Sequence, residues 1–414
     1  MKDPVNNLNG NSFRGRCRAV LPLLLAAVLI LSLAACGKNS SKEEEAQQAA
    51  AEEQAAQEEE VKEEVYVPPV HEEGKLYVGV LQQASHGALN ETTEGLKDGL
   101  SDAFGEDVVV DVRVADGTKA GCDKIMEQIV QDGDDLIVAE GSAALSSAYE
   151  ATKDIPIVGA AVTDFIMAGG VSSVDEPGAN VTGVSDLPPM VTQKDALAAL
   201  SGYEGGIGIV FTEGETGSRF QSELMEKYLD DDGLSWTEYR ISDVSQISST
   251  LEKACSECKV LYLPADNILA MNMAAVKEAS LKNGTKVFTS AKSMCEAGGL
   301  VTISVDYYAL GKRAAEMTDE ILTYGTEKGR KKYDISEEEA DEEDLGDPSD
   351  MSIDRVRDTA AGYYNPEIAE AIGWTPTGDY TALEIESEAG TETETGAGTE
   401  AGAEAGTDAG DAAR

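Results

Sequence analysis

Basic residues are scarce in this sequence. Its 414 residues include 32 Lys and Arg against 78 Asp and Glu, which gives a formal net charge of −46 at pH 7. Proteins that bind nucleic acid neutralise phosphates with Lys and Arg. The composition therefore argues against DNA or RNA as a partner. A large charge of one sign instead keeps a protein soluble, and much of the acidity lies in segments that do not look folded.

Histidine and cysteine are too few to complete an obvious closed metal site. The two histidines are His71 and His86, and Cys255 and Cys258 form the one C-x-x-C pair. A structural zinc site needs four nitrogen or sulfur ligands. We therefore expect no metal. We interpret the cysteines downstream of the N-terminal segment as structural thiols, with one incidental disulfide as the alternative.

Signatures of catalysis and of nucleotide binding are also missing. The sequence contains no G-x-S-x-G nucleophile elbow and no G-x-x-x-x-G-K-[ST] phosphate loop. Gly206 and Gly208 begin a G-x-G pattern, but Phe211 stands where the third glycine of a dinucleotide-binding turn belongs. The spacing suggests no partner that would make His86 a general base. We therefore expect a protein without a cofactor that is not an enzyme.

The N-terminus carries a targeting signal. Arg14, Arg16 and Arg18 precede an apolar run over residues 19–31, and Leu-Ala-Ala-Cys ends at Cys36. A basic stretch, an apolar stretch and small residues before a cleavage point are typical of a secretory signal. The ending resembles a bacterial lipobox, which implies a signal peptide over residues 1–35 and a lipid on Cys36. An uncleaved membrane anchor is the alternative, because residues 19–35 are almost long enough to span a bilayer.

Three further segments are acidic or of low complexity. Residues 36–74 are rich in Glu, Ala and Gln and are expected to form a tether. Residues 381–414 form a Gly, Ala, Thr and Glu tail that is expected to be disordered. Residues 325–350 contain an acidic run, interpreted as a loop insertion, that lacks the D-x-[DN]-x-[DN]-G order of a calcium loop.

The remaining sequence repeats one pattern of strands and helices. Apolar, β-branched runs predict strands at 76–81, 108–114, 136–139, 155–161 and 181–184, and again at 207–211, 235–241, 260–263, 286–289 and 301–303. Helical patterns of about ten residues lie between them, which indicates βαβ units. We predict an α/β fold of two doubly wound parallel-sheet lobes joined by a hinge. Lobe 1 would span 75–187 with a return helix at 307–324, and lobe 2 would span 188–306 with 351–380.

Polar residues follow the predicted strands. Ligands of open α/β sheets bind beyond the carboxyl ends of the strands, so these residues are the candidate ligand contacts in an interlobe cleft. Small, polar and acidic residues suit a small zwitterion. The acidic members are equally suited to capping turns and helices, and a role in acid–base catalysis is a third possibility. The candidates are Gln82, Ser85, His86, Ser142, Thr163, Asp164, Ser185, Asp186, Asp266, Asn267, Asp306 and Tyr307.

Several motifs together resemble a known family. They are G-V-L-Q-Q-A-S-H-G-A-L-N from Gly79, A-V-T-D-F from Ala161, G-A-N-V-T-G-V-S-D-L from Gly178, L-P-A-D-N from Leu263 and V-D-Y-Y-A-L-G from Val305. The region resembles the substrate-binding lipoproteins of ABC importers, and more narrowly the subfamily linked to tryptophan and tyrosine. The resemblance implies a periplasmic binding protein-like fold of type I. It also implies a lipid-anchored, extracytoplasmic protein that delivers a small solute, an amino acid in this subfamily, to a membrane permease.

The sequence departs from the family pattern at three places. Asn90 replaces an aspartate, Phe165 replaces a proline and Ala265 replaces a threonine. We expect the first change to remove a carboxylate near the cleft and the second to add an aromatic ring there. These departures leave open a receptor for a purine nucleoside or a sugar. A surface sensor or enzyme on the same scaffold is also left open.

An amino-acid ligand would bring two charges into the cleft, and each needs a partner because an unpaired buried charge is costly. For the carboxylate we expect Ser142 and the free N–H groups that begin a helix at 143–152. For the ammonium we expect Asp266, with Asp164 and Asp306 as rivals. Asp266 follows a strand and precedes a helix, so a helix cap is the alternative role.

Overall fold

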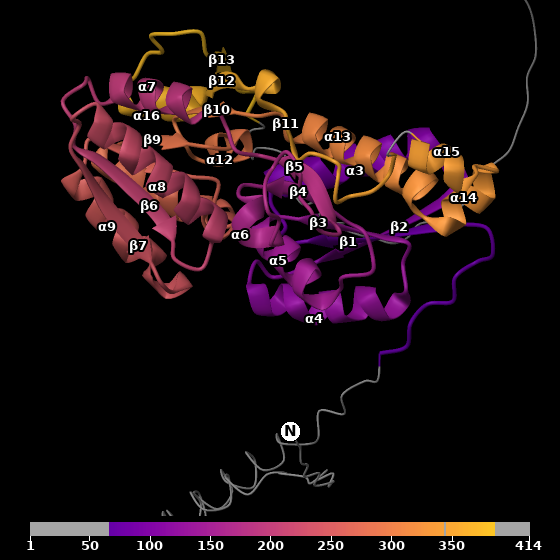
Figure 1. The fold of residues 1–414 in the computed structure, drawn as a ribbon. Coiled ribbons are helices and arrows are strands. Elements are labelled where there is room, and N and C mark those ends of the chain that lie inside the picture. Colours follow the sequence, from indigo (N-terminus) through magenta and orange to yellow (C-terminus); the bar gives the residue numbers. More distant parts are fainter. Residues whose placement is uncertain (1–65, 343–344, 386–414) are drawn as a thin grey trace, which may run out of the picture. The chain divides into compact units, whose positions relative to one another are not determined.

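The structure, a computed structural model, describes residues 66–342 and 345–385 (Figure 1). The predicted signal peptide, Cys36, residues 36–65 of the predicted tether and residues 386–414 of the predicted tail lie outside the described residues. The described residues from Val67 onward belong to one compact unit. This unit contains two α/β lobes, each built on its own sheet.

Lobe 1 is a six-stranded parallel sheet in the order β11-β5-β4-β3-β1-β2. The central strands are buried along their whole length, as expected for a parallel sheet covered on both faces. The bounds are β1 (Leu76–Gln82), β2 (Val108–Val114), β3 (Leu136–Glu140), β4 (Ile157–Val162), β5 (Val181–Ser185) and β11 (Asp354–Arg355).

Helices cover both faces of the lobe 1 sheet. One apolar cluster joins it to α3 and α13, and a second joins it to α4, α5 and α6. The α13 helix buries Leu310, Ala314 and Met317 on one side, the spacing of an amphipathic helix. Its Gly311 lies against α3 so closely that a Cβ there would stand 2.0 Å from the Thr92 carbonyl oxygen. The bounds are α3 (Gly87–Phe104), η1 (Gly105–Asp107), α4 (Lys119–Asp132), α5 (Ser142–Ala151), α6 (Phe165–Gly169) and α13 (Tyr307–Glu320).

Lobe 2 repeats this arrangement with the sheet order β13-β12-β10-β9-β8-β6-β7. Five of its strands, β6 to β10, are parallel, whereas β12 runs antiparallel to β10 and β13 runs parallel to β12. The strand bounds are β6 (Ile207–Thr212), β7 (Trp236–Ile241), β8 (Val260–Leu263), β9 (Lys286–Thr289), β10 (Val301–Ser304), β12 (Ala361–Tyr364) and β13 (Thr381–Ala382). The first five strands of each lobe share one spatial order, so the repeat seen in the sequence is a repeat of the fold.

The helices of lobe 2 also cover two faces. An apolar cluster joins α7, α8 and α16 to one face, and α9 and α11 pack on the other. The bounds are α7 (Met190–Leu200), α8 (Thr216–Asp231), η2 (Val244–Gln246), α9 (Ile247–Glu257), α10 (Asn267–Ala270), α11 (Met273–Asn283), α12 (Lys292–Glu296), η4 (Arg357–Thr359) and α16 (Pro366–Ile372). Cys122, Cys255, Cys258 and Cys295 are free thiols.

The chain crosses between the lobes three times, after β5, after β10 and after β11. Residues 351–380 were expected to belong to lobe 2, but β11 pairs with Val184 and Ser185 of lobe 1. The third crossing therefore follows Arg355. A two-residue edge strand carries too little hydrophobic pattern to be assigned to a sheet from sequence.

The segment expected as a loop insertion is partly helical. After a π-helical turn, η3 (Ile321–Gly325), the chain forms α14 (Glu327–Tyr333) and α15 (Glu337–Glu342). Thr326 caps α14 through the Gly329 N–H, and basic residues fill its last turn, which suits the helix dipole. Lys328 donates to Asp135 of lobe 1 at 2.7 Å. The expected tail likewise starts later, because Thr381 and Ala382 pair with β12.

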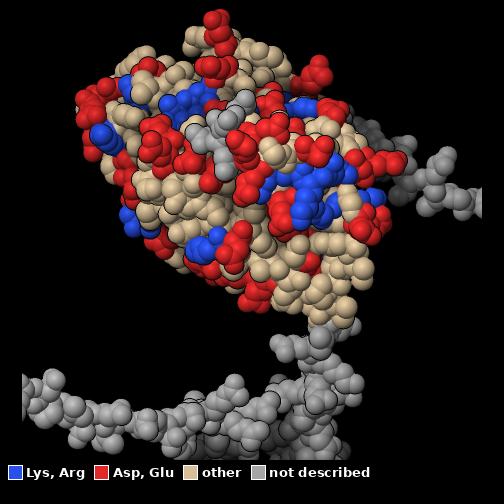
Figure 2. Space-filling view, turned by 45° about the vertical axis from the view of Figure 1, so that its right-hand side comes forward, with Lys and Arg blue, Asp and Glu red and all other residues tan. Residues whose placement is uncertain are grey.

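Acidic side chains dominate the face of the described residues seen in Figure 2, with smaller groups of Lys and Arg among them. This distribution agrees with the composition of the whole chain. Within the described part of the chain, no helix combines the length and apolar character needed to cross a bilayer.

Candidate functional site

A cavity lies between the two lobes at the carboxyl ends of their strands. The space open to a water-sized sphere within it is about 20 Å³, room for about one water molecule, so the two lobes are closed on each other. Lobe 1 contributes loop residues after β1, β3, β4 and β5 and the start of α13. Lobe 2 contributes residues after β6, β8 and β9. This is the location that the strand order of a doubly wound sheet predicts.

Three buried carboxylates line the cavity: Asp186, Glu215 and Asp266. Among the described residues that line it, none is Lys or Arg. Burial raises the pKa of each carboxyl group, and the nearby charge of Asp266 raises the pKa of Glu215 further. A cation placed among them would offset that cost, because an opposite charge favours the ionised carboxylate.

Asp186 is held entirely by lobe 1. It accepts hydrogen bonds from Thr163 Oγ1 at 2.9 Å and from the Tyr307 hydroxyl at 3.1 Å. Thr163 follows an irregularity at the end of β4, where the register shifts between Ala160 and Val162 and Ala161 has φ +52°. A non-glycine residue in the left-handed region is strained, and such strain often marks functional sites.

Glu215 is held by both lobes. It accepts from Gln83 Nε2 of lobe 1 at 2.8 Å and from Asn267 Nδ2 of lobe 2 at 2.9 Å. Asn267 Oδ1 lies 2.7 Å from His86 Nε2 of lobe 1. The chain Gln83–Glu215–Asn267–His86 therefore crosses the cleft twice, and separating the lobes would break two of its three bonds.

Asp266 acts as a cap. Its carboxylate accepts from Leu269 N at 2.9 Å at the start of α10, and from both Thr212 N and Thr212 Oγ1 at 2.8 Å. These bonds satisfy both oxygens within lobe 2. The structure thus gives Asp266 the capping role that the sequence left as an alternative.

Gly217 lets the lobes approach each other. It lies in the first turn of α8, and a Cβ at this position would stand 2.8 Å from Thr163 Oγ1 and 2.9 Å from Ser142 Oγ. Both hydroxyls belong to lobe 1. A side chain at position 217 would therefore press against the opposite wall of the cavity.

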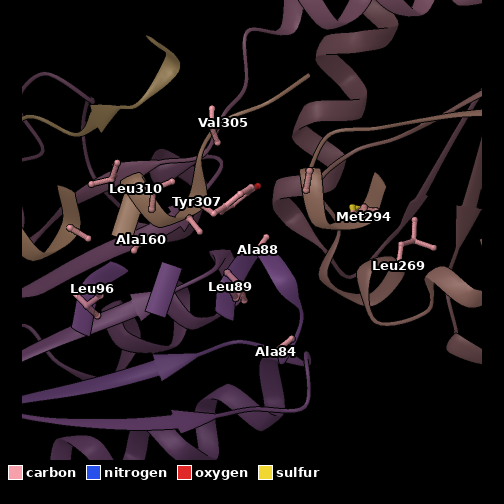
Figure 3. Close-up of a cluster of buried hydrophobic side chains, with 14 of the residues drawn as sticks. Ala84, Ala88, Leu89, Leu96, Ala160, Leu269, Met294, Val305, Tyr307 and Leu310 are labelled. Atoms are coloured by element: carbon pink, nitrogen blue, oxygen red, sulfur yellow. The ribbon is translucent and has the colours of Figure 1, made fainter. Parts of the chain in front are cut away.

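Part of the wall is apolar. Ala88, Leu89 and Tyr307 of lobe 1 and Met294 of lobe 2 line the cavity, and Figure 3 shows them together. All four belong to one apolar cluster that continues from lobe 1 into lobe 2. Small residues widen the cavity between them: Ala88, Ala161, Ala265, Ala270 and Ala291.

Seven of the residues proposed from sequence meet in this cavity, and five do not line it. Gln82 is directed to α3, where its amide donates to Asn90 Oδ1 at 2.8 Å. The side chains of Asp164 and Asp306 cap α6 and α13 by accepting hydrogen bonds from backbone N–H groups of these helices. Ser185 donates to the Thr163 carbonyl, and Ser85 is exposed. The seven are His86, Ser142, Thr163, Asp186, Asp266, Asn267 and Tyr307.

Glu215, Gln83 and Met294 were not among the residues proposed from sequence. The G-x-G pattern considered from sequence ends at Phe211 within β6, and Glu215 lies beyond it, between Gly214 and Gly217. The departures from the family pattern also fall differently from our expectation. Asn90 is exposed and Phe165 is buried in the core of lobe 1, so neither lines the cavity, whereas Ala265 does.

Two α/β lobes with a cavity of polar and apolar residues between them have the architecture of a two-lobed binding protein. Residues 77–345 match the family model for ABC transporter substrate binding proteins, and the chain belongs to this family. The predicted type I fold and the family resemblance are confirmed. The family consists of solute-binding components that serve transporters and work outside the cytoplasm.

The chain is 29% identical to a tyrosine-binding protein of Clostridioides difficile over 248 residues, which are 59% of this chain and 72% of the relative. It is 26% identical to an ABC domain from Streptococcus pneumonia solved in complex with L-Trp. That match has a TM-score of 0.65 and covers 75% of this chain and all of the other. A ligand-free, open substrate-binding protein with adhesive properties from Clostridium difficile is 25% identical, with a TM-score of 0.55 and the same coverage.

Proposed function

We propose that this protein captures an amino acid with an aromatic side chain in the interlobe cavity and delivers it to a membrane permease. The names of two relatives support this ligand class, since one is called a tyrosine-binding protein and another was solved with L-Trp. The apolar wall formed by Leu89, Met294 and Tyr307 offers a surface for an aromatic ring.

The observation that carries the proposal is the set of buried carboxylates in a lining without Lys or Arg among the described residues. An ammonium group is the part of an amino acid that such a lining suits. Glu215 and Asp186 are its proposed partners. Asp266 is set aside, because its oxygens already accept three hydrogen bonds from lobe 2.

Ser142 remains the proposed partner of the ligand carboxylate. It begins α5 and lines the cavity, and the start of a helix favours an anion. One donor there is already used, because Ala143 N donates to Gln83 Oε1 at 2.9 Å. Lys292 is not among the residues lining the cavity; its ammonium lies 3.4 Å from Glu296 Oε1 and over the Tyr363 ring.

A lipid on Cys36 is also part of the proposal. It rests on the Leu-Ala-Ala-Cys sequence after an apolar run. Replacing Cys36 with Ala should abolish labelling by a radioactive fatty acid and release the protein from membranes. Lipid found on another residue of the variant would contradict the anchor assignment.

Titration calorimetry with three indole compounds tests the ligand class. L-Tryptophan should bind, tryptamine should keep part of the affinity because it has the ammonium, and indole-3-propionate should lose the most. Binding of indole-3-propionate as tight as that of L-tryptophan would contradict an ammonium site. Failure of all aromatic amino acids, with binding of a purine nucleoside or a sugar, would overturn the ligand class.

A further inference from the structure

Two polar atoms at the cavity are buried and have no hydrogen-bond partner among the described residues: His86 Nδ1 and Ser293 Oγ. Both residues line the cavity. His86 comes from lobe 1, at the start of α3, and Ser293 comes from α12 of lobe 2. A buried polar atom without a partner costs roughly 1–3 kcal/mol, so two of them facing one cavity indicate a missing polar group.

The two residues lie close together across the cleft. A Cβ built on Gly87, the neighbour of His86, would stand 2.4 Å from Ser293 Cβ. The same two residues also line the groove outside the cavity, so they stand at its mouth. One ligand group of moderate size is therefore able to reach both.

The hydrogen-bond chain across the lobes fixes the proton on His86. Asn267 donates its amide nitrogen to Glu215 Oε2 at 2.9 Å. Asn267 then presents its oxygen to His86 Nε2 at 2.7 Å, which makes Nε2 the donor. A neutral imidazole with its proton on Nε2 has a bare lone pair on Nδ1.

The neutral form of His86 is the favoured one. Burial lowers the pKa of His86, and the hydrogen bond to Asn267 offsets this only in part. Nδ1 is therefore an acceptor at neutral pH, and a group facing it must donate. Ser293 Oγ can accept from that group or donate to it.

We infer that His86 Nδ1 accepts a hydrogen bond from an N–H or O–H of the ligand, with Ser293 Oγ as the second partner from the opposite lobe. This inference rests on the proposed function and adds the residue that selects ligands by a donor. A hydroxyl can donate to His86 while it accepts from Ser293. An ammonium or an indole N–H can satisfy His86 in the same way.

Two substitutions separate this role from the contact between the lobes. The amide nitrogen of Gln reaches about as far as Nε2, so His86→Gln keeps the donor to Asn267 and removes the acceptor. The amide oxygen of Asn lies about where Nδ1 lies, so His86→Asn keeps the acceptor and removes the donor to Asn267. A merely structural His86 would make the two variants equally poor for every ligand.

The probes are pairs of compounds that differ by one donor. L-Tryptophan and 1-methyl-L-tryptophan differ by the indole N–H, and L-tyrosine and L-phenylalanine differ by the hydroxyl. L-Tryptophan and indole-3-propionate differ by the ammonium. Titration calorimetry measures the affinity of the wild type and of both variants for each compound. The ratio of the two affinities within a pair gives the effect of the donor.

We expect the wild type to favour the donor-bearing member of at least one pair by about tenfold or more, the cost of an unpaired buried group. For that pair, His86→Gln should reduce the ratio to about threefold or less, and His86→Asn should preserve it. Binding of the probes with every ratio unchanged in His86→Gln would overturn the inference and leave the proposed function intact. Failure of all the amino-acid probes to bind the wild type would overturn both.

Discussion

The two lobes share one strand order but equip the cavity differently. Lobe 1 supplies mostly neutral groups, and its acid, Asp186, is satisfied by Thr163 and Tyr307 of the same lobe. Lobe 2 supplies Glu215, one of whose partners, Gln83, lies across the cleft. The hydrogen bonds of Asp186 are therefore complete in either position of the hinge, whereas Glu215 keeps both of its partners only when the lobes meet.

This difference between the lobes assigns ligand docking and lobe closure to different residues. A ligand docked on lobe 1 meets an Asp186 carboxylate whose geometry is already set. Glu215 exchanges its contact with water for contacts with Gln83 and with the ligand only when the lobes close. Its contribution to the binding free energy therefore arises in the closed, bound state. A ligand shifts a conformational equilibrium only by its differential affinity for the two states, which makes Glu215 the residue best placed to couple the ligand to closure.

The largest effect is expected from Glu215→Gln. The variant loses the charge and brings an amide N–H toward the donors of Gln83 and Asn267, so the affinity for L-tryptophan should fall by about 2–5 kcal/mol. Titration calorimetry measures it. Glu213→Gln, an exposed change two residues away, is the matched control and should bind normally. Equal affinities of the two variants would remove Glu215 from the site.

A second buried glutamate sharpens the comparison. Glu140 at the end of β3 lies outside the cavity lining and bonds to Thr93 Oγ1, and burial raises its pKa to about 8. The folded state binds this proton more tightly than the unfolded chain, so stability falls as pH rises from about 4.5 to about 8 and is level above.

Glu140→Gln should abolish the part of that decline that Glu140 contributes. The difference in unfolding free energy between the variant and the wild type should be roughly 2 kcal/mol more favourable to the variant at pH 9 than at pH 4. This value is smaller than the full burial penalty of the carboxylate, because the site relaxes around the charge. Urea unfolding at the two pH values measures the gain. Its affinity for L-tryptophan should not change. A difference in stability that does not vary with pH would contradict the assignment.

Gly217→Ala tests whether closure needs the close approach at α8. The added methyl group meets Thr163 and Ser142 of lobe 1 only when the lobes are together, so affinity for L-tryptophan should fall by about tenfold, or 1.4 kcal/mol. Small-angle scattering at saturation should show a less compact form. Gly214→Ala, three residues before Gly217, has open space around it and serves as the control. The same loss of affinity in both variants would indicate an effect on the backbone of this segment and not on closure.

The smallest effect concerns a carboxylate outside the cavity. Asp164 caps α6 through Ile166 N and Met167 N, so Asp164→Ala should cost about 1 kcal/mol of stability. Thermal unfolding measures this change, and calorimetry should give an unchanged affinity. A loss of affinity without a loss of stability would return Asp164 to the list of ligand contacts.

The sequence predicted the lobes because each strand carries a strong local signal. Alternating apolar strands and helices of about ten residues leave few topologies, and the two copies support one another. The same local rule could not assign β11 to lobe 1 or recognise α14 within the acidic segment. Those elements depend on partners far along the chain, such as Val184 for β11 and Asp135 for α14.

The candidate site was predicted only to the level of the strand ends. That rule brings His86, Thr163 and Asn267 to the cavity but does not say which of two neighbours faces it. Successive side chains of a strand point to opposite faces, so Gln82 is directed to α3 and Gln83 to Glu215. Whether an aspartate caps a helix or faces a ligand likewise depends on side-chain geometry that spacing does not contain.

The paths of the two chain ends have a practical use. The described chain enters through β1 of lobe 1 and leaves through β13 of lobe 2. A donor dye attached just before β1 and an acceptor dye just after β13 therefore sit on different halves of the hinge. Energy transfer between them would follow opening one molecule at a time, and it would turn the protein into an optical sensor for its own solute.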